Sequence, residues 1–148
     1  MINGFRGEYY FLSNFSPSKI EYEGYTYLNA EAAFHAQKND SSTYKYLMQF
    51  QPPNAAKREG RKVKLREDWE EVKVYIMYDI VKAKFTQNEN LKAKLLATGD
   101  EELVEANTWH DNYWGTCTCM ACNGMVQLNT NNLGKILMKV REELRNAL

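Results

Sequence analysis

The sequence has 148 residues, close to the commonest size of a single domain, and a chain of this length buries about 70% of its unfolded surface without a disulfide or a metal. Nineteen basic and nineteen acidic residues give a net charge of zero, which excludes general duplex binding driven by a strongly positive surface. Ten tyrosines and three tryptophans provide more flat, half-polar surface than a small core requires, and such surface suits stacking on a base.

The sequence also indicates where the protein works. No apolar run reaches the roughly 18 residues that a membrane span needs, and the N-terminus, MINGFRGEYYF, lacks the basic and apolar regions of a signal peptide. Three cysteines cannot all pair within one chain. We therefore expect a cytoplasmic protein with reduced thiols.

The N-terminal segment predicts short strands. Residues 8–12, EYYFL, are rich in aromatic side chains, as strands are. Residues 20–27, IEYEGYTY, alternate aromatic and acidic side chains around Gly24, which predicts a hairpin or a bulged strand pair. Residues 13–18, which lie between these two segments, are typical of a turn.

Helical patterns follow from residue 29 to residue 97. Asn29 is a good N-cap, and the alanine-rich helix after it should end near Asn39 and Asp40. Pro53 suits the first position of another helix, which Gly60 should end or weaken. The predicted helices are 29–40, 41–50, 53–60, 67–87 and 89–97, and the fourth has Trp69, Val72, Lys73, Ile76, Ile80 and Ala83 at helical spacing.

The C-terminal third combines a strand, an irregular segment and a helix. Residues 103–106, LVEA, predict a strand, whereas residues 107–130 are rich in Asn, Thr, Cys and Gly and predict irregular structure. Asn131 or Asn132 should cap a last helix with Leu133, Ile136, Leu137, Val140 and Leu144 on one face. No repeat or linker occurs. We predict a single domain over residues 1–148, mainly α (α+β), with a small antiparallel sheet.

Four side chains of interest share one face of the predicted helix 29–40. They are Glu31, Phe34, His35 and Lys38. Charged helical faces are usually solvated, and a Glu31–His35 pair there stabilises a helix by only a few tenths of a kcal/mol. Two features favour a pocket instead: the helix directly follows the aromatic hairpin, and the alanines at its other positions permit burial.

Two further positions each allow two interpretations. Trp69 opens an amphipathic helix, where it is either a core anchor or a wall of a cleft that stacks on a ring. Asp111, in the loop DNYWG, is either a turn former or a carboxylate held against an apolar wall for acid–base work. The residues alone leave both choices open.

The cysteines lie close together after His110. A structural zinc takes four ligands, commonly in two separated pairs, whereas Cys117, Cys119 and Cys122 are crowded together and only His110 is available as a fourth ligand. We therefore expect free thiols in an irregular loop, with no metal and no other cofactor. A nucleophilic cysteine is not expected either, because the sequence places no basic partner nearby.

Eight segments follow one another in a recognisable order. They are FLSNF at 11–15, GYTY at 24–27, EAAFHAQK at 31–38, REDW at 66–69, KFTQN at 84–88, LLATG at 95–99, DNYWG at 111–115 and NLGKILM at 132–138. Each segment alone has little specificity, but the ordered set is highly specific. It resembles the YbiA-like family, also called NADAR, over nearly the whole chain.

The resemblance implies a mainly α-helical fold and N-glycosidase activity. Members of this family cut the bond between C1′ of a ribose and a nitrogen, in phosphoribosylamino-pyrimidines of early riboflavin biosynthesis or in ADP-ribose attached to guanine bases. The functional positions of the family fall on Glu31, Trp69, Asp111 and Lys38. The sequence differs from the family at His35, where glutamine is usual, and at residues 28–29, where proline–threonine is frequent.

These positions imply a mechanism with two acids. One carboxylate near C1′ stabilises positive charge or activates water while a second acid protonates the leaving base, and we assign these roles to Glu31 and Asp111. Lys38 either holds the phosphate or, as a neutral amine, attacks the sugar and forms an imine. The predicted binding residues are Trp69, Asn14, Phe15, Arg6, His35, Tyr113 and Trp114, and Arg6 joins Lys38 on the phosphate because the sequence lacks a glycine-rich phosphate loop.

The sequence thus predicts an N-glycosidase that releases ribose 5-phosphate from a phosphoribosylamino-pyrimidine. One alternative removes ADP-ribose from guanine bases in nucleic acid. Another, of a different class, binds NAD or ADP-ribose without catalysis, and a zinc-stabilised interaction module is a further one. The first three imply a phosphoribosyl or ADP-ribosyl ligand and no membrane partner.

Overall fold

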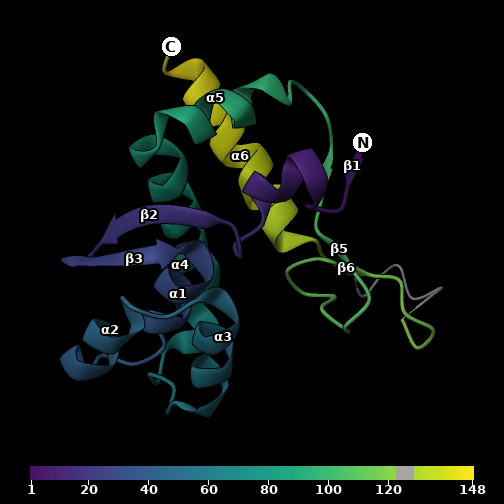
Figure 1. Ribbon diagram of the computed structural model, residues 1–148. Coiled ribbons are helices and arrows are strands. Elements are labelled where there is room, and N and C mark those ends of the chain that lie inside the picture. The colour runs from purple at the N-terminus through teal and green to yellow at the C-terminus, as the bar shows by residue number, and fades with distance from the viewer. Residues whose placement is uncertain (123–128) are drawn as a thin grey trace. The chain divides into compact units, whose positions relative to one another are not determined.

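The computed structural model describes residues 1–122 and 129–148. The chain forms two compact units: the central unit comprises residues 14–92, and the terminal unit comprises residues 1–13 and 93–148. Helices make up most of the regular structure (Figure 1), which confirms the predicted mainly α (α+β) class. In the described ranges, no helix is both long and apolar enough to cross a membrane.

The central unit begins with the predicted hairpin. Strand β2 (Pro17–Tyr22) pairs antiparallel with β3 (Tyr25–Asn29), and the register shifts between Pro17 and Ile20. The turn residues Glu23 and Gly24 both have positive φ, 53° and 88°, as a tight two-residue hairpin turn requires. Ile20 and Tyr27 are fully buried, so this hairpin presents one face to the core.

Helix α1 (Ala30–Ala36) follows β3 without a loop and is the centre of the unit. The Asn29 side chain accepts a hydrogen bond from the Ala32 amide at 2.7 Å, which confirms the predicted N-cap. The four alanines of α1 are fully buried, and the helix contacts α2, α3, α4 and both strands. Because alanine lets neighbouring backbones approach closely, α1 is enclosed rather than lying on the surface. It ends at Ala36, earlier than predicted.

Three helices complete the central unit. They are α2 (Ser42–Met48), α3 (Pro53–Lys62) and α4 (Trp69–Gln87), and α5 (Glu89–Ala97) leads from this unit into the terminal one. The Ser41 side chain caps α2. Pro53 opens α3, as predicted. At the end of α4, the Gln87 side chain exchanges two 2.8 Å hydrogen bonds with the backbone of Glu21 and so fastens the helix to β2.

Gly60 does not end α3, contrary to the prediction. The helix continues for two residues, and Gly60 is buried. A Cβ at this position would lie 2.1 Å from Nδ1 of His35. Gly60 is therefore needed for the close approach of α3 to α1, a contact between distant segments that the local sequence cannot reveal.

The terminal unit contains two short parallel strand pairs. Strand β1 (Ile2–Asn3) pairs with β4 (Leu103–Val104), and β5 (Ala106–Asn107) pairs with β6 (Thr116–Cys117). The strand expected at 103–106 is therefore divided between two pairs. The predicted antiparallel pairing holds only for β2 and β3, because the other two pairs are parallel.

The strand predicted at residues 8–12 is wrong. Residues 7–12 form a 3₁₀ helix, η1 (Gly7–Leu12), in which the adjacent residues Phe11 and Leu12 are both buried. A half-buried strand would place two adjacent side chains on opposite faces, whereas the tight turn of a 3₁₀ helix directs both inward. The aromatic composition of this segment reflects its burial rather than an extended backbone.

The last helix, α6 (Asn132–Asn146), has the predicted apolar face and starts where predicted, with Asn131 at the N-cap position. Asn131 precedes it with a φ of 48° and makes no capping bond. Its side chain instead accepts from the Glu105 amide at 3.0 Å and donates to the Leu103 carbonyl at 2.9 Å. A Cβ at Gly134 would lie 2.1 Å from that carbonyl, so this glycine allows α6 to pack on β4.

Candidate active site

The backbone around Glu31 is held at both sides. Asn29 caps the helix, and the Glu31 amide donates to the Asn14 carbonyl at 3.0 Å. Asn14 is itself buried, and its side-chain amide contacts Sδ of Met77 on α4 at 3.4 Å. The predicted binding residue Asn14 therefore fixes the position of Glu31 in this structure.

Glu31 and His35 form the contact that their spacing predicts. The two atoms Oε1 of Glu31 and Nε2 of His35 are 2.8 Å apart, and the Glu31 side chain is only 13% exposed. Nδ1 of His35 is buried and has no hydrogen-bond partner among the described residues. A proton on Nδ1 would lack an acceptor, so the geometry favours the tautomer that donates from Nε2 to the Glu31 carboxylate.

Lys38 lies just past the end of α1 and turns its amine toward α3 and α4. Nζ donates to the Gly60 carbonyl at 3.2 Å and lies 5.8 Å from the centre of the Trp69 ring. Burial lowers the pKa of Lys38 below its ordinary value; the charge of Glu31 partly opposes this effect, whereas Arg61 and Lys73 add to it. A lowered pKa increases the neutral fraction of the amine, which is the form able to attack a carbon.

Trp69 anchors the core beneath this group. Its side chain is only 5% exposed, and its ring lies 5.1 Å from the Phe34 ring, centre to centre, at 53°. Of the two interpretations of Trp69, the observed packing is that of a core anchor, whose ring contacts Phe34 and Lys38. Stacking of Trp69 on a substrate ring stays a prediction.

Phe15 lies in the same unit, in the segment that precedes β2. The ring is half-buried, and Nζ of Lys57, on α3, lies 5.9 Å from its centre. This contact connects the N-terminal edge of the central unit to α3. The central unit therefore contains six of the predicted site residues: Glu31, Lys38, His35, Trp69, Asn14 and Phe15.

Asp111 shapes its own loop. Its Oδ1 atom accepts hydrogen bonds from the amides of Trp114 at 2.8 Å and Tyr113 at 3.3 Å. This is the turn-forming role that the sequence allowed, and it leaves Asp111 half-buried. The rings of Tyr113 and Trp114 meet edge to face, 4.9 Å apart, so the carboxylate and two aromatic rings occupy one short segment.

The remaining predicted residue, Arg6, is exposed and belongs to the terminal unit. This unit also contains Asp111, Tyr113 and Trp114. The predicted site residues thus form two groups, one in each unit. In the central group, Asn14 and His35 contact Glu31, and Lys38 contacts the Trp69 ring. Convergence of Glu31 and Asp111 on one sugar carbon stays a prediction.

An open hollow of about 580 Å³ adjoins this group on the central unit. It is lined by Asn39, Asp40, Lys64, Leu65, Arg66, Glu67 and Asp68. The Arg66 guanidinium is already engaged there by Asp68, with Nε to Oδ1 at 2.6 Å. Neither Glu31 nor Lys38 lines this hollow. We therefore assign the chemistry to the group of Glu31, His35 and Lys38 rather than to the hollow.

The structure also reveals a lysine to which the sequence assigned no role. Lys84, on α4, is 1% exposed, and its Nζ lies 3.1 Å from the Ser16 hydroxyl and 5.1 Å from the centre of the Phe85 ring. Burial lowers its pKa to about 7. The sequence signal was its spacing from Ile76 and Ile80, which places a lysine on the buried stripe of the helix; Ala83, predicted for that stripe, is only half-buried.

This burial predicts a pH-dependent stability. Between about pH 7 and the ordinary lysine pKa of 10.5, the unfolded chain holds a proton that the folded chain lacks, so the free energy of unfolding rises with pH in this range. We expect Lys84→Met to increase the free energy of unfolding at pH 7 by on the order of 1–3 kcal/mol, with a gain that shrinks toward pH 10.

Urea unfolding at several pH values measures this effect, and Lys62→Met, at an exposed position of the same unit, is the control. A loss of stability in Lys84→Met at pH 7 would contradict the prediction, because it would mean that the protonated amine is well compensated in the folded chain.

Comparison with known proteins identifies what this arrangement resembles. The family model described as the NADAR domain matches residues 4–145, which includes both units. An N-glycosidase of Nostoc punctiforme is 37% identical over 142 residues, covering 92% of this chain and 86% of the relative. The N-glycosidase YbiA of Escherichia coli is 38% identical over 135 residues, covering 89% and 79%.

Two further matches extend this likeness. A riboflavin biosynthesis protein of Vibrio vulnificus is 37% identical over 138 residues; the match covers 91% of this chain but only 35% of that longer protein. The NMR structure of E. coli YbiA superposes with a TM-score of 0.80 at 34% identity, covering 99% of this chain and 88% of the other. The sequence relatives and the structural match therefore indicate the same family.

Proposed function

Since this chain belongs to the NADAR family and is an N-glycosidase, we propose that its substrate is a phosphoribosylamino-pyrimidine of riboflavin biosynthesis. The bond broken joins C1′ of the ribose to the amino nitrogen of the pyrimidine, and the sugar product is ribose 5-phosphate. The relative named a riboflavin biosynthesis protein supports this choice, and so does the zero net charge, which provides no general attraction to nucleic acid. A cytoplasmic location is part of the proposal.

The observation that carries the proposal is the group of Glu31, His35 and Lys38, in which His35 is buried and the other two residues are half-buried. Breaking the bond at C1′ develops positive charge on the sugar, and a carboxylate in a poorly solvated position stabilises that charge strongly. Glu31 is such a carboxylate, because its side chain is 13% exposed and its Oε1 is fixed by His35. An amine with a lowered pKa lies in the same group.

Hydrolysis requires two carboxyl groups: Glu31 acts as the base and Asp111 acts as the acid. Glu31 takes a proton from water as the water oxygen bonds to C1′, while the bond between C1′ and nitrogen breaks and the leaving nitrogen receives a proton from Asp111. In this proposal, the ring that contacts the base is that of Phe15, Tyr113 or Trp114. The phosphate is held by two cations, Arg6 and Lys38.

Product analysis tests the proposal. The protein is incubated separately with a phosphoribosylamino-pyrimidine and with an oligonucleotide that carries ADP-ribose on guanine, and the released sugar is identified by mass spectrometry. We expect ribose 5-phosphate from the first and no ADP-ribose from the second. Release of ADP-ribose with the pyrimidine left intact would contradict the proposed substrate, and so would an absence of any released sugar.

A further inference from the structure

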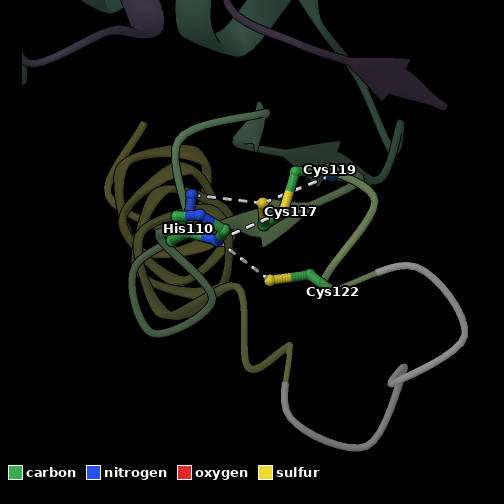
Figure 2. A group of neighbouring side chains, drawn as sticks. All are labelled: His110, Cys117, Cys119 and Cys122. Carbon is green, nitrogen blue, oxygen red and sulfur yellow. Dashed lines mark hydrogen bonds between the residues drawn. The ribbon is translucent and has the colours of Figure 1, made fainter.

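Four side chains with metal-binding atoms meet in the terminal unit. The ligand atoms of His110, Cys117, Cys119 and Cys122 all lie within 4.8 Å of one another, and Figure 2 shows the imidazole facing the cysteine sulfurs. We propose that these residues bind one structural zinc ion, which holds the loop that follows β5. The proposal does not depend on the substrate or on the mechanism.

The distances agree with tetrahedral coordination. Nδ1 of His110 lies 3.2 Å from Sγ of Cys119 and 3.6 Å from Sγ of Cys122. With zinc bonded to sulfur at about 2.3 Å and to nitrogen at about 2.05 Å, neighbouring ligand atoms in a tetrahedron are about 3.5–3.8 Å apart. All separations are at most 4.8 Å, within about 1 Å of the tetrahedral value, so side-chain shifts of this size would complete the coordination.

Backbone amides support the deepest ligand. The amide of His110 donates to Sγ of Cys117 at 3.2 Å, and the amide of Cys119 approaches the same sulfur at 3.5 Å. Cys117 is itself buried. Hydrogen bonds of this kind stabilise a thiolate, and the groups that surround the ligands of a metal site orient them in this way.

The β5–β6 pair and a loop held by Asn107 bring His110 to the cysteines. The pairing of β5 with β6 places Asn107 opposite Cys117. The Asn107 side chain accepts from the amides of Trp109 and Asp111, each at 3.2 Å, and donates to the Asp111 carbonyl at 2.7 Å. A tight loop over residues 107–111 results, and it carries His110 back to the cysteines.

His110 adopts a backbone conformation that needs compensation. Its φ is 71°, in the left-handed region that residues with a side chain adopt only at a cost in energy. Bonding of the imidazole to an ion would offset this cost. The strained residue is therefore the one that completes the ligand set.

The chemistry of the ligand set selects zinc. Thiolates with an imidazole favour zinc over magnesium and calcium, which prefer oxygen ligands. Four protein ligands leave no open position, which is typical of a structural rather than a catalytic site. Three thiol protons leave when the ion binds.

This proposal departs from the expectation of free thiols and no metal. That expectation rested on the crowding of the three cysteines and on the absence of a second cysteine pair. The structure answers this objection, because the ligand atoms of His110 and the three cysteines lie within 4.8 Å of one another despite the close spacing along the chain.

Metal reconstitution tests the site. The full chain is reduced with a phosphine, stripped with a chelator, checked by thiol titration to contain three free thiols, and titrated with zinc. We expect one zinc per chain and a rise in Tm of about 5–10 °C. Cobalt should produce the strong visible absorption of tetrahedral thiolate coordination.

Variants locate the ion. We expect Cys119→Ser, Cys122→Ser and His110→Gln each to weaken zinc binding by more than about 100-fold. The loss of a residue that only hydrogen-bonds to a metal ligand already costs about 10–100-fold in affinity, and the loss of a ligand should cost more. Met120→Ala changes a 98% exposed side chain within the same loop, and His35→Gln removes the other histidine of the chain. Both controls should bind zinc as the natural sequence does.

Two outcomes would overturn the proposal. One is a fully reduced chain that binds no zinc. The other is stoichiometric zinc that persists in the cysteine variants, which would place the ion elsewhere. The readouts are metal content, absorption and Tm, so a failure of the proposed substrate would not affect the result.

Discussion

Glu31→Gln is expected to lower kcat/KM for sugar release by about 10²–10⁴-fold, the range that a positioned acid or base contributes. Glutamine has nearly the same shape, and its carbonyl oxygen can still accept the hydrogen bond from Nε2 of His35 that the carboxylate accepts at 2.8 Å. It carries no negative charge to stabilise C1′ and cannot take a proton from water. The loss should therefore fall on catalysis rather than on folding.

The measurement is the initial rate of ribose 5-phosphate release, with circular dichroism and Tm recorded in parallel. Glu59→Gln is the matched control, since it makes the same chemical change at an exposed position of α3. We expect this control to retain the natural rate. A Glu31→Gln variant that keeps its full rate would remove Glu31 from the mechanism, whereas one that unfolds would assign Glu31 a structural role.

The sequence predicted correctly those features that depend on contacts between residues a few positions apart. Asn29 caps α1 through a hydrogen bond to a residue three positions ahead, and the spacing of Glu31 and His35 alone indicates their contact. The strand predicted at 8–12 failed because the conformation of Phe11 and Leu12 depends on burial against distant residues. The β1–β4 and β5–β6 pairs join segments that no short-range pattern connects.

In the candidate site too, the sequence indicates individual residues but not the surroundings that packing gives them. The sequence identified the residues of α1, but the surroundings of Lys38 depend on Gly60 and Trp69, which come from two other helices. The low pKa of Lys84 is equally a product of packing. The sequence offers His110 as a fourth ligand beside the cysteines, but spacing along the chain does not reveal the loop held by Asn107 that brings its Nδ1 to 3.2 Å from Sγ of Cys119.

Lys38 should distinguish the two mechanisms through a single pair of variants. In the imine mechanism, its nitrogen bonds to C1′ as the bond to the base breaks and the base takes a proton; the sugar ring then opens to an imine, which water hydrolyses to free the sugar and the amine. This route needs a neutral amine, and burial favours one because it lowers the pKa of Lys38. A phosphate contact needs only a positive charge.

Lys38→Arg keeps the charge but replaces the amine with a guanidinium that stays protonated. If the imine forms, we expect Lys38→Arg and Lys38→Met to lose activity equally, by about 10³-fold or more, comparable with the loss of Glu31. If Lys38 only holds phosphate, the arginine variant should stay within about 10-fold of the natural rate, while the methionine variant should bind substrate weakly.

Borohydride added during turnover gives an independent readout, because it reduces an imine to a stable amine. If the imine forms, a pentose phosphate adduct should appear on the peptide that contains Lys38. It should be absent from both Lys38 variants and present in Lys64→Arg, which changes an exposed lysine of the same unit. Lys38 is the lysine that this test examines, because it is half-buried and contacts Gly60 and Trp69. Turnover at the natural rate without an adduct would exclude the imine and leave Lys38 as a phosphate ligand.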